Sequence, residues 1–279
     1  VKYFLEQCLL SIEASNVNFG VETIVVDNNS PDNSVEYLQP KFPNVTFIAN
    51  KDNPGFAKAN NQGIKLSSGE YVLILNPDTV LGENVLQNVC NFLNNTADAG
   101  AIGVKMINGN GMFLAESKRG FPNPWNSFCK ISGLSRLFPS SSFFGKYHLR
   151  YLDENKTHQV DVLAGAFMMI RRTALDKSGL FDEDFFMYGE DIDLSYRITK
   201  AGYKNYYLPE KIIHYKGEST RKDMKYVKIF YEAMYIFFKK HFPHYGKLYS
   251  LFITFGIYAR GSVSALKRLV KSDNPENST

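Results

Sequence analysis

Short apolar runs alternate with helix-like stripes along most of the chain. The clearest run covers residues 71–75 and leads directly into Asn76, Pro77 and Asp78. A run of β-favouring apolar residues predicts a strand buried on both faces, and the residues after it predict a tight turn at its carboxyl end. Taken alone, this turn could serve only to end the strand and to cap the next helix.

The same alternation along the chain predicts an α/β domain with a mainly parallel sheet and flanking helices. The expected strands cover residues 21–26, 44–49, 71–75, 101–106, 160–171 and 204–208. The expected helices cover residues 1–14, 34–38, 57–66, 83–93, 173–178 and 192–201. Because such a domain usually opens with a strand, whereas residues 1–14 carry a helical stripe, we expect a first strand of the domain to be missing from this sequence.

The pattern changes in the middle and at the end of the chain. Between residues 108 and 159 Gly, Pro, Ser and aromatic residues dominate, and a stretch this long without clear elements is usually functional or mobile. Beyond residue 220, aromatic and basic residues predict helices over 223–241 and 245–270. We therefore expect an α/β domain over 1–220, a helical extension over 221–270 and a disordered tail over 271–279.

Composition narrows the class of protein. The net charge of +4 is too small to suggest a general nucleic-acid binder, so no nucleic-acid partner is expected. Cys8, Cys90 and Cys129 lack metal-site spacing and are expected to be buried free thiols, as in a reducing compartment. The sequence shows neither a signal-peptide pattern nor an apolar window long enough to span a membrane. These features predict a cytoplasmic location.

Carboxylates stand at three places where an apolar strand ends or a helix begins. They are Asp27, Asp78 and the pair Glu190 and Asp191. In a parallel sheet these positions would meet at one rim, where ligands bind. A rim of carboxylates suits a divalent cation that bridges to phosphates, and it also suits a general base. Each residue also has a local explanation, because Asp27 could hold a turn and Asp191 could cap the following helix.

Six short motifs, in this order, resemble the inverting family 2 glycosyltransferases of GT-A fold, and in particular their bacterial rhamnosyltransferase-like branch. The resemblance covers residues 1–220. The motifs lie at residues 25–30, 53–63, 75–78, 165–172, 181–194 and 214–219.

The resemblance implies a UDP- or dTDP-sugar as donor. In this family Asp27 would hydrogen-bond the pyrimidine base. Asn53 (or its neighbour Asp52), Gly55 and Phe56 would line the nucleoside, with Asn61 close by.

The resemblance also implies Mg²⁺ or Mn²⁺ as cofactor. Asp78 matches the last Asp of the family's Asp-x-Asp motif and would bind the ion across the diphosphate. Asn76 replaces the first Asp of that motif, and it is still an oxygen ligand, although a neutral one. His214 would be a late ligand of the metal or the diphosphate, although it could also be a buried structural histidine. Lys216, Ser219 and Thr220 would be phosphate contacts.

Asp191 would be the general base that takes the proton of the acceptor hydroxyl as that hydroxyl displaces the diphosphate. One displacement inverts the anomeric centre, so a second carboxylate nucleophile is not needed. Gly165 and Glu190 would lie beside the sugar or the acceptor, and Gly165 could alternatively mark a β-bulge. The acceptor would be a glycan or a lipid-linked glycan in surface polysaccharide synthesis.

Alternatives remain open at the level of function. A nucleotidyltransferase that makes nucleotide sugars would show a Gly-rich basic loop near its first strand, and a non-catalytic paralogue would bind nucleotide or carbohydrate only. The helices over 245–270 could pack on the core. They could instead lie on the inner leaflet of an anionic membrane, with apolar side chains inserted into it, namely Leu248, Leu251, Phe252, Phe255 and Tyr258.

Overall fold

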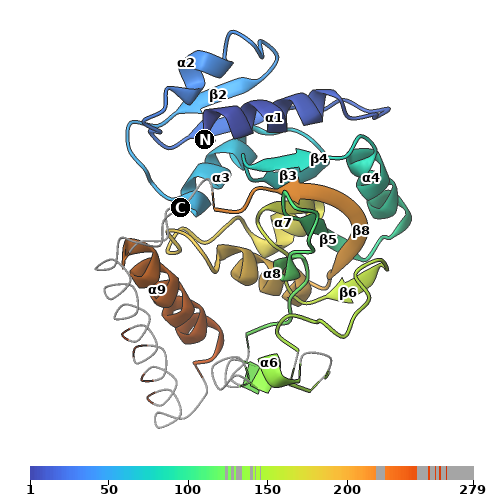
Figure 1. Ribbon diagram of the computed structural model, residues 1–279, viewed down its shortest axis with the longest axis vertical. Coiled ribbons are helices and arrows are strands. Elements are labelled where there is room, and N and C mark those ends of the chain that lie inside the picture. Colours follow the sequence, from blue (N-terminus) through green and yellow to red (C-terminus); the bar gives the residue numbers. More distant parts are fainter. Residues whose placement is uncertain are drawn as a thin grey trace.

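Strands and helices alternate along the described chain (Figure 1). The computed structural model describes residues 1–122, 125–126, 129, 134–138, 141, 143–144, 146–217, 224–243, 251, 255, 258 and 262. Its elements in chain order are α1 (Lys2–Glu13), β1 (Ile24–Asp27), α2 (Ser34–Leu38), β2 (Thr46–Ala49), α3 (Phe56–Leu66), β3 (Tyr71–Leu75), β4 (Thr79–Leu81), α4 (Val85–Asn95), β5 (Ala99–Ile107), η1 (Ala115–Ser117), α6 (Leu134–Leu137), β6 (His158–Val160), β7 (Phe167–Arg171), α7 (Arg172–Ser178), α8 (Glu190–Lys200), β8 (Lys204–His214) and α9 (Met224–His241).

The central sheet is mixed. Its strands follow the order β3-β7-β5-β8-β4, with β6 paired to β8. Only β5 and β8 run parallel in this sheet, and its other pairs are antiparallel. β1 and β2 form a separate parallel pair. The α/β class is therefore confirmed, whereas the expectation of a mainly parallel sheet is wrong. Apolar runs do not reveal direction, because any strand covered on both faces reads as a continuous apolar run.

Two strands differ from their predicted bounds for local reasons. β8 continues to His214, although the apolar pattern stops at Leu208, because Pro209 and Glu210 sit in a register shift between Val104 and Lys105 of β5. Bulges are places where a sheet tolerates proline. The predicted strand over 160–171 is divided into β6 and β7, so Gly165 lies in the connection between two strands rather than at a bulge inside one.

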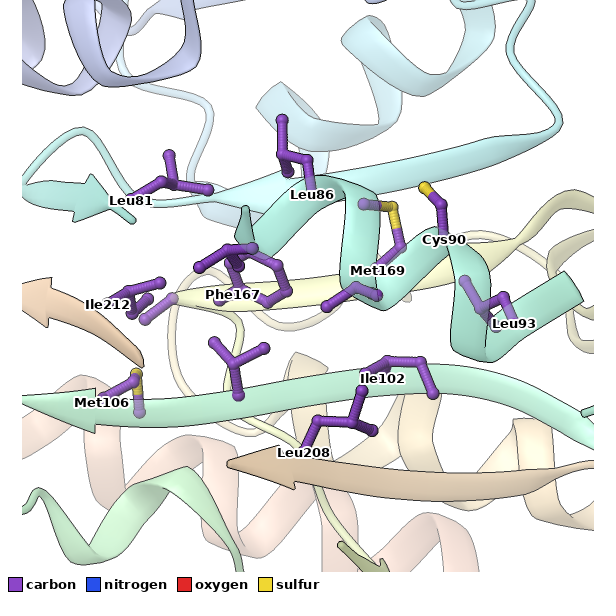
Figure 2. Close-up of a cluster of buried hydrophobic side chains, with 14 of the residues drawn as sticks. Leu81, Leu86, Cys90, Leu93, Ile102, Met106, Phe167, Met169, Leu208 and Ile212 are labelled. Atoms are coloured by element: carbon purple, nitrogen blue, oxygen red, sulfur yellow. The ribbon is translucent and has the colours of Figure 1, made fainter. Parts of the chain in front are cut away.

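The core lies on both faces of the central sheet. On one face, α4 places Leu86, Cys90 and Leu93 over Phe167 and Met169 of β7 (Figure 2). On the other face, Met168 and Ile170 of β7 meet side chains of α7 and α8, among them Leu175, Leu194 and Ile198. Successive β7 residues therefore face opposite layers, as strand geometry requires. This double cover explains why the strand is apolar throughout.

A buried carboxylate fastens α9 to α8. Asp193 is 0% exposed, and its side chain lies 2.7 Å from Arg197 Nε, 2.8 Å from Lys240 Nζ and 2.6 Å from His241 Nε2. Burial opposes ionisation of Asp193, but the hydrogen bonds from these three partners lower its pKa to about 2. Phe237 of α9 packs beside Phe185. The helix α9, which lies in the first half of the predicted helical extension, thus packs against α8.

The rest of that extension lies outside the described residues, apart from residues 242–243 and four positions between 251 and 262. The predicted tail over 271–279 lies outside them as well. Among the described helices, none combines the length and the apolar character needed to span a membrane. The cysteine expectation is confirmed, since Cys8, Cys90 and Cys129 are buried thiols that form no disulfide among the described residues.

We expect Asp193→Asn to lower the free energy of unfolding by about 3 kcal/mol, because it leaves buried cations without their counter-charge. The folded-state pKa of Asp193 lies below its ordinary value of 3.8, so this contribution is present above pH 3.8 and is lost as pH falls through about 2. Urea unfolding at neutral pH measures the change, with the exposed Asp176→Asn as control. Equal stability of the two variants would contradict the anchoring role.

Candidate active site

The carboxyl ends of β1 and β2 place Asp27 beside the loop that follows β2. Asp27 pairs with Ala49 in the parallel register, and the Asn50 N–H donates to the Asp27 carbonyl oxygen at 2.8 Å. The Asp27 side chain accepts from the Ser30 N–H at 3.0 Å. Asn50 also donates to the Asn28 side chain at 3.0 Å. Asp27 therefore holds the turn that follows β1, and its side chain lies at the carboxyl edge of this strand pair.

The turn at Asn53 and Gly55 ties this edge to the loop before α8. Asn53 Oδ1 accepts from the Gly55 N–H at 3.1 Å. Gly55 has φ +96°, and a Cβ there would lie 2.5 Å from the carbonyl oxygen of Phe186. The Phe56 N–H donates to that oxygen at 2.8 Å. Only glycine fits a positive φ at so close an approach of two backbones.

Asp78 and His214 are brought together by antiparallel pairing. Thr79 of β4 pairs with His214 of β8, and the Tyr215 N–H donates to the Asp78 carbonyl oxygen at 2.8 Å. This register leaves Asp78 Oδ1 3.3 Å from His214 Nε2. Asp78 is 1% exposed. Among the described residues, His214 Nδ1 has no hydrogen-bond partner.

The donor set of this corner fits a divalent ion that is shared with a phosphate group. The described part of the chain contains no cluster of three or more His, Cys, Asp or Glu side chains able to hold a metal alone. Ions such as Mg²⁺ are commonly held by one or two protein side chains together with substrate phosphates. Asp78 and His214 can supply that number, so they suit an ion that arrives with a diphosphate.

Two neighbours of this corner were also expected to take part. Asn76 lies in the turn between β3 and β4, and its N–H donates to the Ala166 carbonyl oxygen at 3.1 Å. Lys216 follows His214, and its ammonium group forms an ion pair with Glu116 of η1. Ser219 and Thr220, also considered as phosphate contacts, lie outside the described residues. Asn76 thus joins the Asp78 corner to the segment around Gly165.

Three segments hold the carboxylate of Asp191. Its Oδ2 lies 2.5 Å from Arg119 Nη2 and 3.2 Å from the Gly165 nitrogen, and its Oδ1 accepts from the Ile192 N–H at 2.8 Å. A Cβ at Gly165 would lie 3.7 Å from Asp191 Cβ and 3.4 Å from the Phe56 ring. The structure therefore brings Phe56, Gly165 and Asp191 together. Gly189, not Asp191, is the N-cap residue of α8.

Arg119 is the functional residue that sequence reasoning missed. It forms an isolated backbone bridge with Val162, and its Nη2 also donates to the Leu163 carbonyl oxygen at 2.8 Å. Burial works against the charge of Arg119, but Asp191 outweighs it and the pKa of Arg119 is raised. No motif points to Arg119 within residues 108–159. The one available signal is that residues 117–152 contain no Asp or Glu, so a buried arginine there must find its counter-charge elsewhere.

Glu190 is a buried carboxyl beside Asp191. It is 5% exposed, and its Oε2 has no hydrogen-bond partner among the described residues. Burial and then the charge of Asp191 raise the pKa of Glu190 to about 8. The protein therefore favours the neutral form of Glu190 next to the ion pair between Arg119 and Asp191. Raised carboxyl pKa values of this kind are typical of acid–base sites.

The amide of Asn61 is engaged by the protein itself. Its Nδ2 donates to the Phe181 carbonyl oxygen and to Glu183 Oε1, both at 2.9 Å, and its Oδ1 accepts from the Phe181 N–H at 3.0 Å. Asn61 is also buried. These bonds use both amide hydrogens. Asn61 therefore supports the loop that leads to α8 and has no amide hydrogen left for a nucleotide-sugar donor.

Residues 2–179 match the model of a protein family described as "Glycosyl transferase family 2". The chain belongs to this family. Among its relatives, an N-acetylglucosaminyl-diphospho-decaprenol L-rhamnosyltransferase of Mycobacterium tuberculosis is 27% identical over 246 residues, covering 84% of this chain and 79% of that protein. The minor teichoic acid biosynthesis protein GgaB of Bacillus subtilis is 30% identical over 253 residues, covering 86% of this chain and 25% of that protein.

Solved structures agree on the fold. A mannosyltransferase of Pyrobaculum calidifontis in complex with GDP-Man and Mn²⁺ aligns with a TM-score of 0.56 at 16% identity, covering 96% of this chain and 72% of that one. S. aureus TarS 1–349 in complex with UDP aligns with a TM-score of 0.55 at 16% identity, covering 93% and 68%. The expected family, its GT-A fold and its glycosyltransferase activity are confirmed, which answers the nucleotidyltransferase alternative. The roles of individual residues stay predictions.

We expect Glu190→Gln to flatten the pH dependence of stability. The folded-state pKa of about 8 lies above the ordinary 4.5, so the native state binds the proton more tightly and the free energy of unfolding falls as pH rises through this window. The variant lacks this pH-dependent loss. The free energy of unfolding of the variant minus that of the wild type should therefore increase by about 2 to 4 kcal/mol between about pH 5 and pH 8. Urea unfolding at both pH values measures it. Glu13→Gln, at an exposed site, is the control, and an unchanged difference for Glu190→Gln would contradict the buried neutral carboxyl.

Proposed function

We propose that this glycosyltransferase moves a sugar from a UDP- or dTDP-sugar to a hydroxyl of a glycan or lipid-linked glycan, with inversion and with Mg²⁺ or Mn²⁺. The observation that carries the proposal is the Asp191 carboxylate, held between Arg119 and the Gly165 N–H beside Phe56. The relatives support the acceptor class, since one acts on a diphospho-decaprenol-linked sugar and another belongs to teichoic acid synthesis. We propose the same general setting, surface polysaccharide synthesis, for this chain.

The nucleoside of the donor is proposed to bind at the edge formed by Asp27, Asn53, Gly55 and Phe56. Asp27 can accept hydrogen bonds from the N–H groups of a base. The Phe56 ring offers an apolar face, and the close approach of Gly55 to Phe186 keeps this wall fixed. We assign Asn61 the supporting role that its bonds to Phe181 indicate.

The diphosphate is proposed to bind at the Asp78 corner. Asp78 and His214 would hold Mg²⁺ or Mn²⁺, and the bound ion would offset the charge that develops on the leaving diphosphate. The neutral Asn76 beside Asp78 leaves one carboxylate there, which suits an ion whose remaining ligands are phosphate oxygens. Lys216, two residues beyond His214, is proposed to approach the phosphates by exchanging Glu116 for them.

Asp191 is proposed to act as the general base. The acceptor hydroxyl oxygen forms a bond to the anomeric carbon, the bond from that carbon to the diphosphate oxygen breaks, and the hydroxyl proton passes to the Asp191 carboxylate. Arg119 is the positioning residue that holds the carboxylate in one orientation. Burial favours the neutral form of Glu190, so this residue would add little negative charge beside the attacking oxygen. Gly165 leaves room for the sugar beside Asp191.

The acceptor is proposed to be reached at the inner leaflet of the cytoplasmic membrane. Leu251, Phe255 and Tyr258 are exposed, and their spacing of four and three residues places them on one side of a helix. This stripe, within the predicted 245–270 segment, is the proposed peripheral contact. Basic residues that flank it, such as Lys247 and Arg260, suit anionic headgroups.

Nucleotide binding tests the proposed donor and metal corner. We expect UDP or dTDP to raise the Tm, and Mn²⁺ to increase that rise, because a ligand that binds only the folded state at about 100 times its Kd adds about 2.7 kcal/mol. In His214→Ala the nucleotide should still bind, while most of the increment from Mn²⁺ disappears. His158→Ala on β6 is the matched histidine control. No rise with any pyrimidine nucleoside diphosphate, or a full Mn²⁺ increment in His214→Ala, would overturn the assignment.

A further inference from the structure

An exposed apolar cluster projects from the segment that follows Arg119. Trp125, Leu137, Phe138 and Phe143 each expose between 42% and 71% of their surface, and we call them the aromatic tip. Single exposed apolar residues are common on soluble proteins, but contiguous groups of large ones mark interaction sites. The aromatic tip is such a group, built around the short helix α6.

The aromatic tip is held together by its own ring contacts. The Trp125 and Phe143 ring centroids lie 5.0 Å apart, and Trp125 Nε1 donates to the Phe143 carbonyl oxygen at 3.3 Å. The half-buried Phe144 joins them, at 5.1 Å from Phe143 and 5.4 Å from Phe138. The rings therefore pack against one another while their outer faces remain in water, which favours covering them with a partner.

The aromatic tip is fixed at its root to the proposed base. The chain leaves the site at Arg119, whose guanidinium contacts Asp191, and the next residue, Gly120, donates its N–H to the Tyr147 carbonyl oxygen at 3.0 Å. The two ends of this segment, Gly120 and Tyr147, are thus joined by a hydrogen bond. In Figure 1, α6 lies in the lower part of the view, far from α1 and α2 at the top. The segment that carries the aromatic tip therefore begins at the residue that contacts Asp191 and leads away from α1 and α2.

The charge of this segment points to one class of partner. Residues 120–152 contain Lys130, Arg136, Lys146 and Arg150 but no Asp or Glu. Lys146 and Arg150 are exposed to solvent. Large apolar and aromatic side chains in a segment whose own charged residues are all basic match the interfacial region of an anionic bilayer, where tryptophan is enriched and each basic residue adds attraction to headgroups.

We propose that the aromatic tip inserts into the interfacial layer of an anionic membrane and seats Asp191 above that surface. This proposal rests on the proposed function in one respect, the acceptor, because a lipid-linked glycan would present its sugar at the membrane surface. The contact is separate from the stripe at Leu251, Phe255 and Tyr258. It assigns a role to the middle of the chain, where the sequence shows no regular pattern.

Trp125 is the only tryptophan of the chain, so its fluorescence reports on the aromatic tip without labelling. With vesicles of equimolar phosphatidylcholine and phosphatidylglycerol, we expect the Trp125 emission to shift to shorter wavelength and to be quenched by brominated acyl chains. Vesicles of phosphatidylcholine alone should give a weaker response, and added salt should weaken the response to the anionic vesicles.

Leu137→Ser combined with Phe143→Ser keeps the tryptophan and should weaken partition into the anionic vesicles by about tenfold to a hundredfold, since two buried apolar side chains are lost. Leu66→Ser combined with Met112→Ser, at exposed positions outside the aromatic tip, is the matched control and should bind as the wild type does. Both double variants should keep the wild-type Tm and its rise with UDP or dTDP. That readout separates a failure of this proposal from a failure of the proposed function.

Three results would overturn the proposal. Sedimentation of the protein with vesicles without a change in the Trp125 emission would assign the contact to another surface. A shift of the emission with protein concentration in the absence of vesicles would assign the aromatic tip to contact between copies of the chain. Equal partition of the wild type and the Leu137→Ser, Phe143→Ser variant would remove the role of the aromatic tip.

Discussion

The ion pair between Arg119 and Asp191 is the constraint on which the site depends. A largely buried charge pair is tolerated only when both partners are well placed, because removing either one leaves the other uncompensated. The 2.5 Å contact therefore locks together the strand-like segment at Arg119 and the start of α8. The Gly165 N–H adds the connection between β6 and β7. In this way three distant stretches of sequence are held in register around one carboxylate.

The mixed sheet supplies the second half of the arrangement. Antiparallel pairing of β4 with β8 sets Asp78 against His214, and antiparallel pairing of β3 with β7 sets Asn76 against Ala166. The corner at Asp78 and the carboxylate of Asp191 are thus joined through two neighbouring residues, Gly165 and Ala166. The buried cluster around Asp193 then holds α9 against the same helix that begins with Glu190 and Asp191. One helix, α8, carries both the proposed base and the contact that holds α9.

The sequence predicts the elements better than their directions. Apolar periodicity is enough to locate β3, α4 and α8, because burial alone determines it. It does not reveal that β7 runs antiparallel to both β3 and β5, since direction depends on long connections that leave no periodic trace. The same holds at β8, where Pro209 interrupts the pattern although the strand continues to His214.

The candidate site divides in the same way. Asp27, Asp78 and Asp191 were expected from their places at element ends, and the structure shows which neighbours each of them has. Arg119 could not be expected, because a lone arginine in an irregular stretch has no local signature and its importance comes from a contact 72 residues away. Asn61 shows the opposite case, since its motif position suggests a donor contact whereas its amide is bonded to Phe181.

The central claim is that Asp191 removes the acceptor proton, and its most direct test is transfer by Asp191→Asn, with Arg119→Gln beside it. The donor is the UDP- or dTDP-sugar that raises the Tm most in the presence of Mn²⁺. The account predicts a fall in kcat of about a hundredfold to ten-thousandfold for Asp191→Asn, with nucleotide binding unchanged. It predicts a smaller fall, an inverted product and a changed acid limb of the pH–rate profile for Arg119→Gln. Transfer by Asp191→Asn at the wild-type rate would contradict the account.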